Sequence, residues 1–227
     1  MTDAARPTKH GLNRRTVLRN GLLVGLGAVA TTVAAPNLAG VALASDSVSA
    51  TAPNGNKVGF TCQQNWSWCK YCMGLFYGTA WQGTIGCASG VDANRHVPGS
   101  EWDYLVPYGT PPAAASGYLQ SGWQYCDQCN GLYDGPRNVS NGFCVNSPFG
   151  GPLYHSSSDT GTFDYFLPYQ AGWAGGPMQD YWSWCDQCDL LFYGPDMANS
   201  VCPNTRNIYG GLHGLGAWTY WIPSPSA

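Results

Sequence analysis

The sequence predicts an all-β protein with three internal repeats, and three observations lead to this fold class. The chain of 227 residues contains 30 Gly, 16 Pro, 10 Trp, 14 Tyr and 7 Phe, a composition that favours short strands joined by turns. No window shows a sustained apolar pattern at the spacing of an amphipathic helix. One pattern of cysteines and aromatic residues occurs three times. We expect a single β-trefoil-like domain of three pseudo-repeats, with three small modules in series as the alternative.

Residues 1–44 are typical of an export signal. Basic residues precede the apolar run "GLLVGLGAVATTVAAP", and Ala42 and Ala44 in "VALAS" provide the small side chains of a cleavage site. Glycines and threonines interrupt the run, which is too short to cross a hydrocarbon core of about 30 Å comfortably. We therefore expect no stable membrane insertion after cleavage.

Arg14 and Arg15 stand directly before this apolar run, in "NRRTVLRNG". The segment resembles the twin-arginine (Tat) export motif, with Asn13 and Val17 as departures from its usual Ser or Thr and its usual Phe. The resemblance implies a bacterial protein that is secreted through the Tat pathway after it has folded. A metal ion could then be loaded in the cytoplasm.

The rest of the chain divides into a lead-in and three units that share one pattern. Each unit has a Trp three residues before its first cysteine, an aromatic residue next to that cysteine, and Leu-aromatic-x-Gly after the second cysteine. We expect the three repeated tryptophans, Trp66, Trp123 and Trp182, to be core residues. The intervening Pro/Gly/Ala-rich segments are predicted loops. The boundaries are 45–62 for the lead-in, 63–109 for unit 1, 118–170 for unit 2 and 178–223 for unit 3.

Each unit is expected to contain the same series of short strands. A strand or hairpin carries the C-x-x-C pair, a turn follows at the glycine, and a further strand lies near the third cysteine. The unit closes on aromatic-x-Tyr-x-aliphatic-Pro, as in "EWDYLVP" and "TFDYFLP". In the first of these, Trp102, Tyr104 and Val106 alternate with a period of two and share one face of the strand.

Each unit also contains three cysteines and one histidine in the same order. The spacings are C-x2-C-x14-C-x8-H, C-x2-C-x14-C-x10-H and C-x2-C-x13-C-x10-H. Three thiols and one imidazole suit a tetrahedral zinc ion, and both sulfurs of C-x-x-C reach one ion from a single tight turn. In ligand count and spacing the units resemble zinc ribbons and knuckles, and the modular alternative is three zinc-ribbon-like modules. The predicted zinc ligands are Cys69, Cys72, Cys87 and His96; Cys126, Cys129, Cys144 and His155; and Cys185, Cys188, Cys202 and His213.

Disulfide bonds are the competing explanation for these cysteines. Exported proteins oxidise their thiols, and Cys62, which lies outside the repeat pattern, brings the total to 10 and allows complete pairing. The third thiol of each unit would then pair between units or with Cys62. The histidines would be hydrogen-bonding residues or ligand contacts. Zinc, disulfides and mixtures of the two remain open.

No catalytic constellation is evident. Glu101 is the only glutamate, and Asp103 and Asp164 align with each other but with Thr219 in unit 3. Neither G-x-S-x-G nor H-E-x-x-H is present. A thioredoxin-type redox role is disfavoured because no βαβ pattern surrounds the C-x-x-C pairs. If all four residues of a unit bind zinc, the ion has no open coordination position, and its role is structural.

Binding of an extracellular ligand is the expected function, with a polysaccharide or cell-wall glycan as the first candidate. After residue 44 the chain has 12 acidic and five basic side chains, which argues against nucleic acid as a partner. Rigid Trp and Tyr side chains stack on flat apolar faces, and three similar units could combine weak affinities. The alternatives are a protein-binding or inhibitor module and a metal-sequestering protein. The candidate ligand-binding residues are Trp81, Trp173, Tyr154 and Tyr209.

Overall fold

The computed structural model describes residues 45–78, 86–90, 95–99, 103–136, 142–145, 154–157, 163–204 and 211–224. The predicted export signal and the candidate residues Trp81 and Tyr209 lie outside these residues. In the described part of the chain, no helix is long and apolar enough to cross a membrane.

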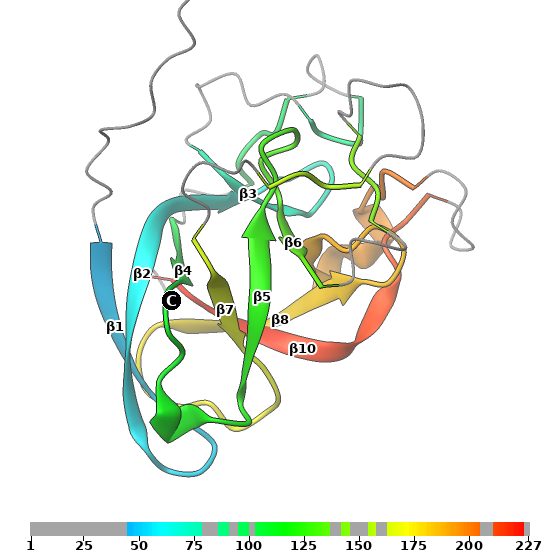
Figure 1. The fold of residues 1–227 in the computed structure, drawn as a ribbon. Coiled ribbons are helices and arrows are strands. Elements are labelled where there is room, and N and C mark those ends of the chain that lie inside the picture. Colours follow the sequence, from blue (N-terminus) through cyan, green and yellow to red (C-terminus); the bar gives the residue numbers. More distant parts are fainter. Residues whose placement is uncertain are drawn as a thin grey trace, which may run out of the picture. The chain divides into compact units, whose positions relative to one another are not determined.

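The described residues form three antiparallel sheets, one for each unit (Figure 1). At the centre of each sheet is the strand that contains the repeated tryptophan, β2, β5 or β8, and we call it the long strand. The sheet orders are β1-β2-β3 with β4 also on β2, then β6-β5-β7, and finally β10-β8-β9. The prediction of an all-β chain with three repeats is therefore confirmed. The strands are β1 (Ser45–Thr51), β2 (Lys57–Trp68), β3 (Leu75–Tyr77), β4 (Tyr104–Pro107), β5 (Leu119–Tyr125), β6 (Leu132–Asp134), β7 (Tyr165–Pro168), β8 (Met178–Cys185), β9 (Leu191–Tyr193) and β10 (Leu215–Pro223), with 3-10 helices η2 (Ala113–Ala115) and η3 (Gly194–Asn199).

Pairing within each unit follows one plan. The long strand pairs with the short strand that follows the C-x-x-C turn and with the strand that closes the unit. The register is the same in all three copies, because the repeated tryptophan faces the third residue of the short strand: Trp66↔Tyr77, Trp123↔Asp134 and Trp182↔Tyr193. The strand expected near the third cysteine is not found, since the described residues around Cys87, Cys144 and Cys202 are loops.

One hydrophobic core joins the three units. Its buried members comprise four residues from each unit, including the three repeated tryptophans, which are 0% exposed as predicted. The tryptophan of one unit packs edge-on against the closing-strand tyrosine of another, with ring centroids 5.1–5.5 Å apart. These pairs are Trp66–Tyr165, Trp123–Tyr220 and Trp182–Tyr104. A shared core of this kind belongs to a single domain and not to modules in series.

The lead-in is a structured part of this domain. β1 and the first half of β2 form a hairpin whose inner face packs with Trp173. Trp173 is 5% exposed, its ring centroid lies 5.8 Å from that of Phe60, and its Nε1 donates to the Tyr169 carbonyl at 3.1 Å. Trp173, one of the four candidate ligand-binding residues, is therefore a core residue and not a surface residue. Its Gly-rich loop folds over the hairpin, where Thr51 and Ala174 exchange two backbone hydrogen bonds.

Three hydrogen bonds between tyrosines and glutamines of different units, which were not predicted, accompany this core. The hydroxyls of Tyr165 and Tyr220 donate to the side-chain oxygens of Gln63 and Gln120, and Tyr104 is hydrogen-bonded to Gln179. Each glutamine lies three residues before the tryptophan of its unit. Because buried hydroxyls require partners, these glutamines satisfy the tyrosines that close the core.

Candidate metal centres

All 12 predicted zinc ligands come together as three separate groups, one per unit. Within each group the four potential ligand atoms lie within 4.8 Å of one another, and all four residues are buried. The groups are Cys69, Cys72, Cys87 and His96 in unit 1, Cys126, Cys129, Cys144 and His155 in unit 2, and Cys185, Cys188, Cys202 and His213 in unit 3.

A tight turn after the long strand places the first two sulfurs. In unit 1 the Met73 N–H donates to the Cys69 carbonyl at 2.8 Å, and the Cys69 N–H donates to the Gly74 carbonyl at 2.9 Å. The residue after the second cysteine takes a left-handed conformation in every unit, with φ of +61° at Met73, +59° at Asn130 and +62° at Asp189. This reversal brings the C-x-x-C turn back on itself, so that both sulfurs face one point.

A backbone hydrogen bond places the histidine beside that turn. The residue after the first cysteine donates its N–H to the carbonyl of the residue after the histidine, at 3.0 Å in units 1 and 2 and 3.3 Å in unit 3. The bonds are Lys70 to Val97, Asp127 to Ser156 and Asp186 to Gly214. The imidazole rings stack on Phe76, Tyr133 and Phe192, with centroids 4.6–4.7 Å apart.

The distances within each group fit a tetrahedral ion. The first and third cysteine sulfurs lie 3.7, 3.7 and 3.9 Å apart, and the second sulfur lies 3.5 Å from the histidine Nδ1 in every unit. Zinc bonds of about 2.3 Å to sulfur and about 2.05 Å to nitrogen place tetrahedral neighbours about 3.8 and about 3.6 Å apart. The three groups could therefore hold a metal ion such as zinc.

The structure does not contain the alternative disulfide framework. All ten cysteines are free. The sulfur pairs of 3.7–3.9 Å are far beyond the disulfide bond length of about 2.05 Å. Cys62 lies apart from the three groups, in the cluster beneath the β1–β2 hairpin, and its sulfur is 3.9 Å from the Phe60 carbonyl oxygen. Burial raises the pKa of Cys62 to about 12, so this thiol is protonated and unreactive.

Charge is distributed unevenly within the groups. Hydrogen bonds from Cys72 and Cys87 hold the pKa of Cys69 well below its ordinary value, while hydrogen bonds with Cys69 and Cys87 raise the pKa of Cys72. Burial would lower the pKa of His96, but its hydrogen bonds with Cys69 and Cys87 raise that pKa to about 9. The sulfurs thus stabilise a positive charge at the centre of the group, which is the charge a metal ion brings.

The second nitrogen of each ligand histidine contacts another unit. His96 Nε2 lies 2.9 Å from the Cys129 carbonyl oxygen, His155 Nε2 lies 2.9 Å from that of Cys188, and His213 Nε2 lies 3.1 Å from that of Cys72. A carbonyl only accepts, so Nε2 carries a proton, and Nδ1 is the nitrogen that would bind a metal ion. Sequence spacing gives no signal for these contacts, because they form between units.

Among the described residues, the exposed aromatic side chains include one predicted ligand-binding residue and two that were not predicted. Of the four ligand-binding candidates, only Tyr154 is described and exposed, at 53%. On the paired strands β8 and β10 of unit 3, Tyr181, Trp218 and Leu215 are 58%, 44% and 53% exposed, and we call these three residues the unit 3 surface. The Tyr181 carbonyl oxygen and Leu215 Cδ2 both lie within 4 Å of the Cβ position of Gly194, so these two residues are neighbours.

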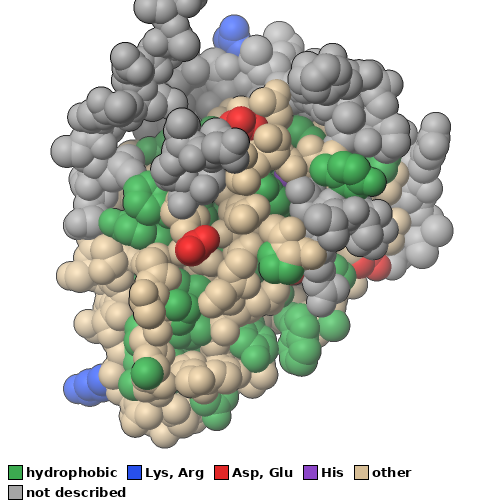
Figure 2. Space-filling view, viewed as in Figure 1, with side chains coloured by type: hydrophobic (Ala, Val, Ile, Leu, Met, Phe, Trp, Pro, Cys, Tyr) green, Lys and Arg blue, Asp and Glu red, His purple; other side chains and the backbone are tan. Residues whose placement is uncertain are grey.

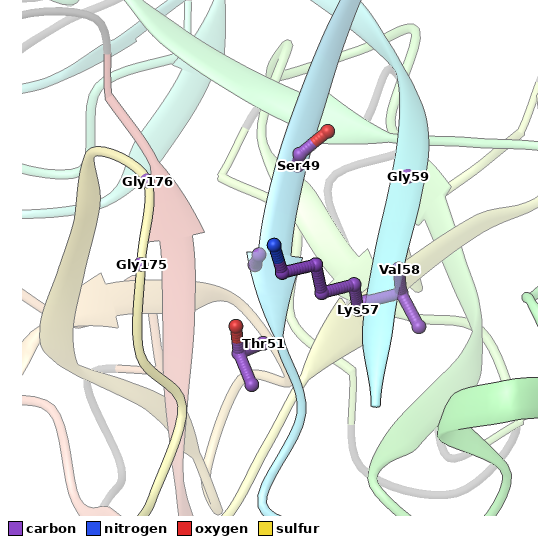
Figure 3. Close-up of a pocket in the computed structure, with 8 residues that line it drawn as sticks. Ser49, Thr51, Lys57, Val58, Gly59, Gly175 and Gly176 are labelled. Atoms are coloured by element: carbon purple, nitrogen blue, oxygen red, sulfur yellow. The ribbon is translucent and has the colours of Figure 1, made fainter. Parts of the chain in front are cut away.

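A shallow pocket with a mixed polar and apolar lining lies beside the β1–β2 hairpin (Figure 3). The side chains of Ser49, Thr51 and Lys57 line it, and Gly59 and Gly176 leave backbone exposed at its edges. Among the described residues that line this pocket, Lys57 is the one with a charged side chain. On the face shown in Figure 2, hydrophobic side chains are spread among neutral ones and the few charges are isolated.

Comparisons with protein-family models, with curated proteins and with solved structures find no match to this chain. The proposals below therefore depend on the geometry of the site itself.

Proposed function

We propose that the chain is an exported, non-enzymatic binding protein whose fold is held by three structural zinc ions. The observation that supports zinc is the threefold occurrence of a buried Cys3His group with tetrahedral distances. Sulfur and imidazole ligands in a tetrahedral arrangement suit zinc better than calcium or magnesium, which prefer oxygen. Export through the Tat pathway, as residues 1–44 indicate, would allow zinc to be inserted before secretion.

A structural role fits these groups better than catalysis or metal sequestration. Four protein ligands complete a tetrahedral zinc shell and leave no position for water or substrate. The ligand residues are at most 5% exposed, and most belong to the clusters that pack beneath the sheets. Removal of zinc would leave thiols and imidazole facing one another in the core, so the ion would not exchange without loss of structure.

The zinc hypothesis is tested by measuring metal content and free thiols on the exported protein. We expect about three zinc ions per chain, no mass shift from disulfides, and loss of near-UV circular dichroism when a strong chelator is added. A protein without metal and without titratable thiols would contradict the proposal. Metal that exchanges while the circular dichroism stays native would instead favour sequestration.

Ligand binding would use the unit 3 surface, with a glycan as the proposed ligand class. Tyr181 has a φ of +67°, which is unfavourable for a tyrosine, and its side chain is largely exposed. The aligned positions hold Asn65 and Gly122, which tolerate this conformation better. An exposed aromatic residue kept at a strained position is typical of a functional site. Trp218 on the paired strand β10 offers a second partly exposed ring, one that packs edge-on against Tyr169 with centroids 5.5 Å apart. A secreted protein-binding module is the alternative.

The change Tyr181→Gly separates stability from binding. We expect the free energy of unfolding to rise by roughly 0.5–1 kcal/mol, because glycine relieves the left-handed strain. Binding to cell-wall polysaccharide on a glycan array should fall at least several-fold. Asn65→Gly is the matched control, since it relieves the same backbone conformation outside the unit 3 surface and should leave binding unchanged. A wild-type protein that ignores the array but captures a protein from culture supernatant would favour the alternative.

A further inference from the structure

The three Cys3His groups form a closed ring through their histidines. His96 of unit 1 bonds to Cys129 of unit 2, His155 of unit 2 bonds to Cys188 of unit 3, and His213 of unit 3 bonds back to Cys72 of unit 1. Given the zinc binding proposed above, we propose that this ring makes the three sites load cooperatively, so that a chain holds either no zinc or a full set.

Each bond joins the ligands of two different sites. The donor is the Nε2–H of one site's ligand histidine, and the acceptor is the carbonyl of the second cysteine in the next site's C-x-x-C turn. A bound ion fixes that turn and therefore fixes the acceptor. The fixed acceptor holds the imidazole of the neighbouring site in the tautomer and orientation that coordinate through Nδ1.

A second set of bonds joins the same pairs of units in the same direction. The residue after the second cysteine accepts a backbone N–H from the short strand of the preceding unit: Tyr77 donates to Asn130 at 2.8 Å, Asp134 to Asp189 at 3.0 Å, and Tyr193 to Met73 at 2.9 Å. Each C-x-x-C turn thus touches the preceding unit through two consecutive carbonyls. A turn that is disordered without its ion would lose both contacts.

The effect of one such contact on metal affinity is substantial. Hydrogen-bond partners of ligand histidines typically change metal affinity by about 10- to 100-fold. Coupling between sites is reciprocal, so each bond favours loading of the donor's site and of the acceptor's site by the same factor. In a ring of three, the last site to load benefits from two occupied neighbours. Chains with one or two ions are therefore disfavoured.

The cooperative model is tested by adding less than one equivalent of zinc per chain to the metal-free protein and recording native mass spectra. We expect the metal-free and fully loaded chains to dominate. A binomial distribution of zero, one, two and three ions, as independent sites give, would overturn the inference. A saturated protein with fewer than three ions would contradict the proposed zinc sites instead, so the two failures are distinguishable.

A ligand-preserving variant tests whether the ring carries the coupling. His96→Cys keeps four ligands, because a set of four cysteine thiolates is an ordinary zinc site, but it removes the bond to the Cys129 carbonyl. We expect this variant to hold three ions at saturation and to show prominent one- and two-ion species in the partial titration. Phe76→Leu is the control, since it removes the stacking on His96 and keeps the ring, and its spectra should resemble those of the wild type.

If His96→Cys still gives mainly metal-free and fully loaded chains, the coupling comes from folding as a whole. This result would overturn the role of the ring. If His96→Cys binds fewer than three ions even at saturation, the same substitution is made at His155 or His213, and the wild-type titration still decides on cooperativity. Each result thus bears on either the cooperativity or its cause.

Discussion

Ten buried cysteines divide into two chemical types in this protein. Nine lie in the Cys3His groups, where hydrogen bonds among the side chains hold the pKa of Cys69 below its ordinary value and raise the pKa of Cys72. Cys62 has no such surroundings and behaves as a small apolar side chain in the cluster that contains Phe60 and Trp173. A cysteine in a Cys3His group can bind metal, whereas Cys62 only fills space in an apolar cluster. Substitution at the two kinds of cysteine should therefore affect zinc content and stability differently.

The residue-scale prediction compares Cys62→Ala with Cys87→Ala. Cys62→Ala should lower the free energy of unfolding by only about 1 kcal/mol, because one buried sulfur is lost from a packed cluster. Its zinc content should equal that of the wild type. Cys87→Ala should lose zinc from unit 1 and cost several times more stability. Metal analysis with chemical denaturation measures both, and a loss of zinc in Cys62→Ala would contradict this division.

The ligand residues were predictable because each copy in the chain shows independently which residues the unit needs. The same logic would have found the glutamine three residues before each repeated tryptophan, which holds the Tyr165 and Tyr220 hydroxyls in two of the units. The histidine–carbonyl contacts were not predictable, since a backbone acceptor leaves no trace in residue identity. Tyr181 differs from Asn65 and Gly122 at its aligned positions, and departure from the repeat was its only signal.

At the scale of elements, the sequence of the lead-in contains a pattern that predicts its β1–β2 hairpin. Val48, Ala50 and Ala52 alternate with polar residues, Val58 and Phe60 do the same, and an Asn-Gly pair stands between the two runs. Such a pattern is a strong hairpin signal. Gly55 takes a φ of +85° in the turn, a conformation that glycine adopts readily. What the sequence does not reveal is the partner, because the loop that covers the hairpin is more than a hundred residues away.

Trp173 is that partner, and its removal tests the attachment of the hairpin. Trp173→Ala should cost about 3–5 kcal/mol of unfolding free energy, because a large buried ring leaves a cavity against Phe60. Amide hydrogens of β1 should exchange faster as the hairpin loosens. Trp218→Ala is the control, since its ring is 44% exposed and its loss should cost far less. Equal costs for the two variants would mean that Trp173 does not anchor the hairpin.

At the scale of the molecule, three kinds of contact between units run in a cycle. The tryptophan–tyrosine pairs, the histidine–carbonyl bonds and the bridges between short strands each pass from unit 1 to 2, from 2 to 3, and from 3 to 1. The bridges are Phe76↔Gly131, Tyr133↔Leu190 and Gly74↔Phe192. Repetition in the sequence predicts similar units, but only the packing shows that the cycle closes. A closed cycle leaves no unit with a complete core of its own.

An isolated unit should consequently fail to fold even with its full set of zinc ligands. Residues 63–109 carry Cys69, Cys72, Cys87 and His96, so the peptide should bind zinc, yet Trp66 and Tyr104 would lose the rings of Tyr165 and Trp182 that cover them. We expect narrow amide dispersion in its ¹H–¹⁵N spectrum with saturating zinc, whereas residues 45–227 with zinc should give a dispersed spectrum. A dispersed spectrum from the isolated unit would mean that each zinc site organises its own module. The shared core would then be a consequence of three folded units meeting, and not the condition for their folding.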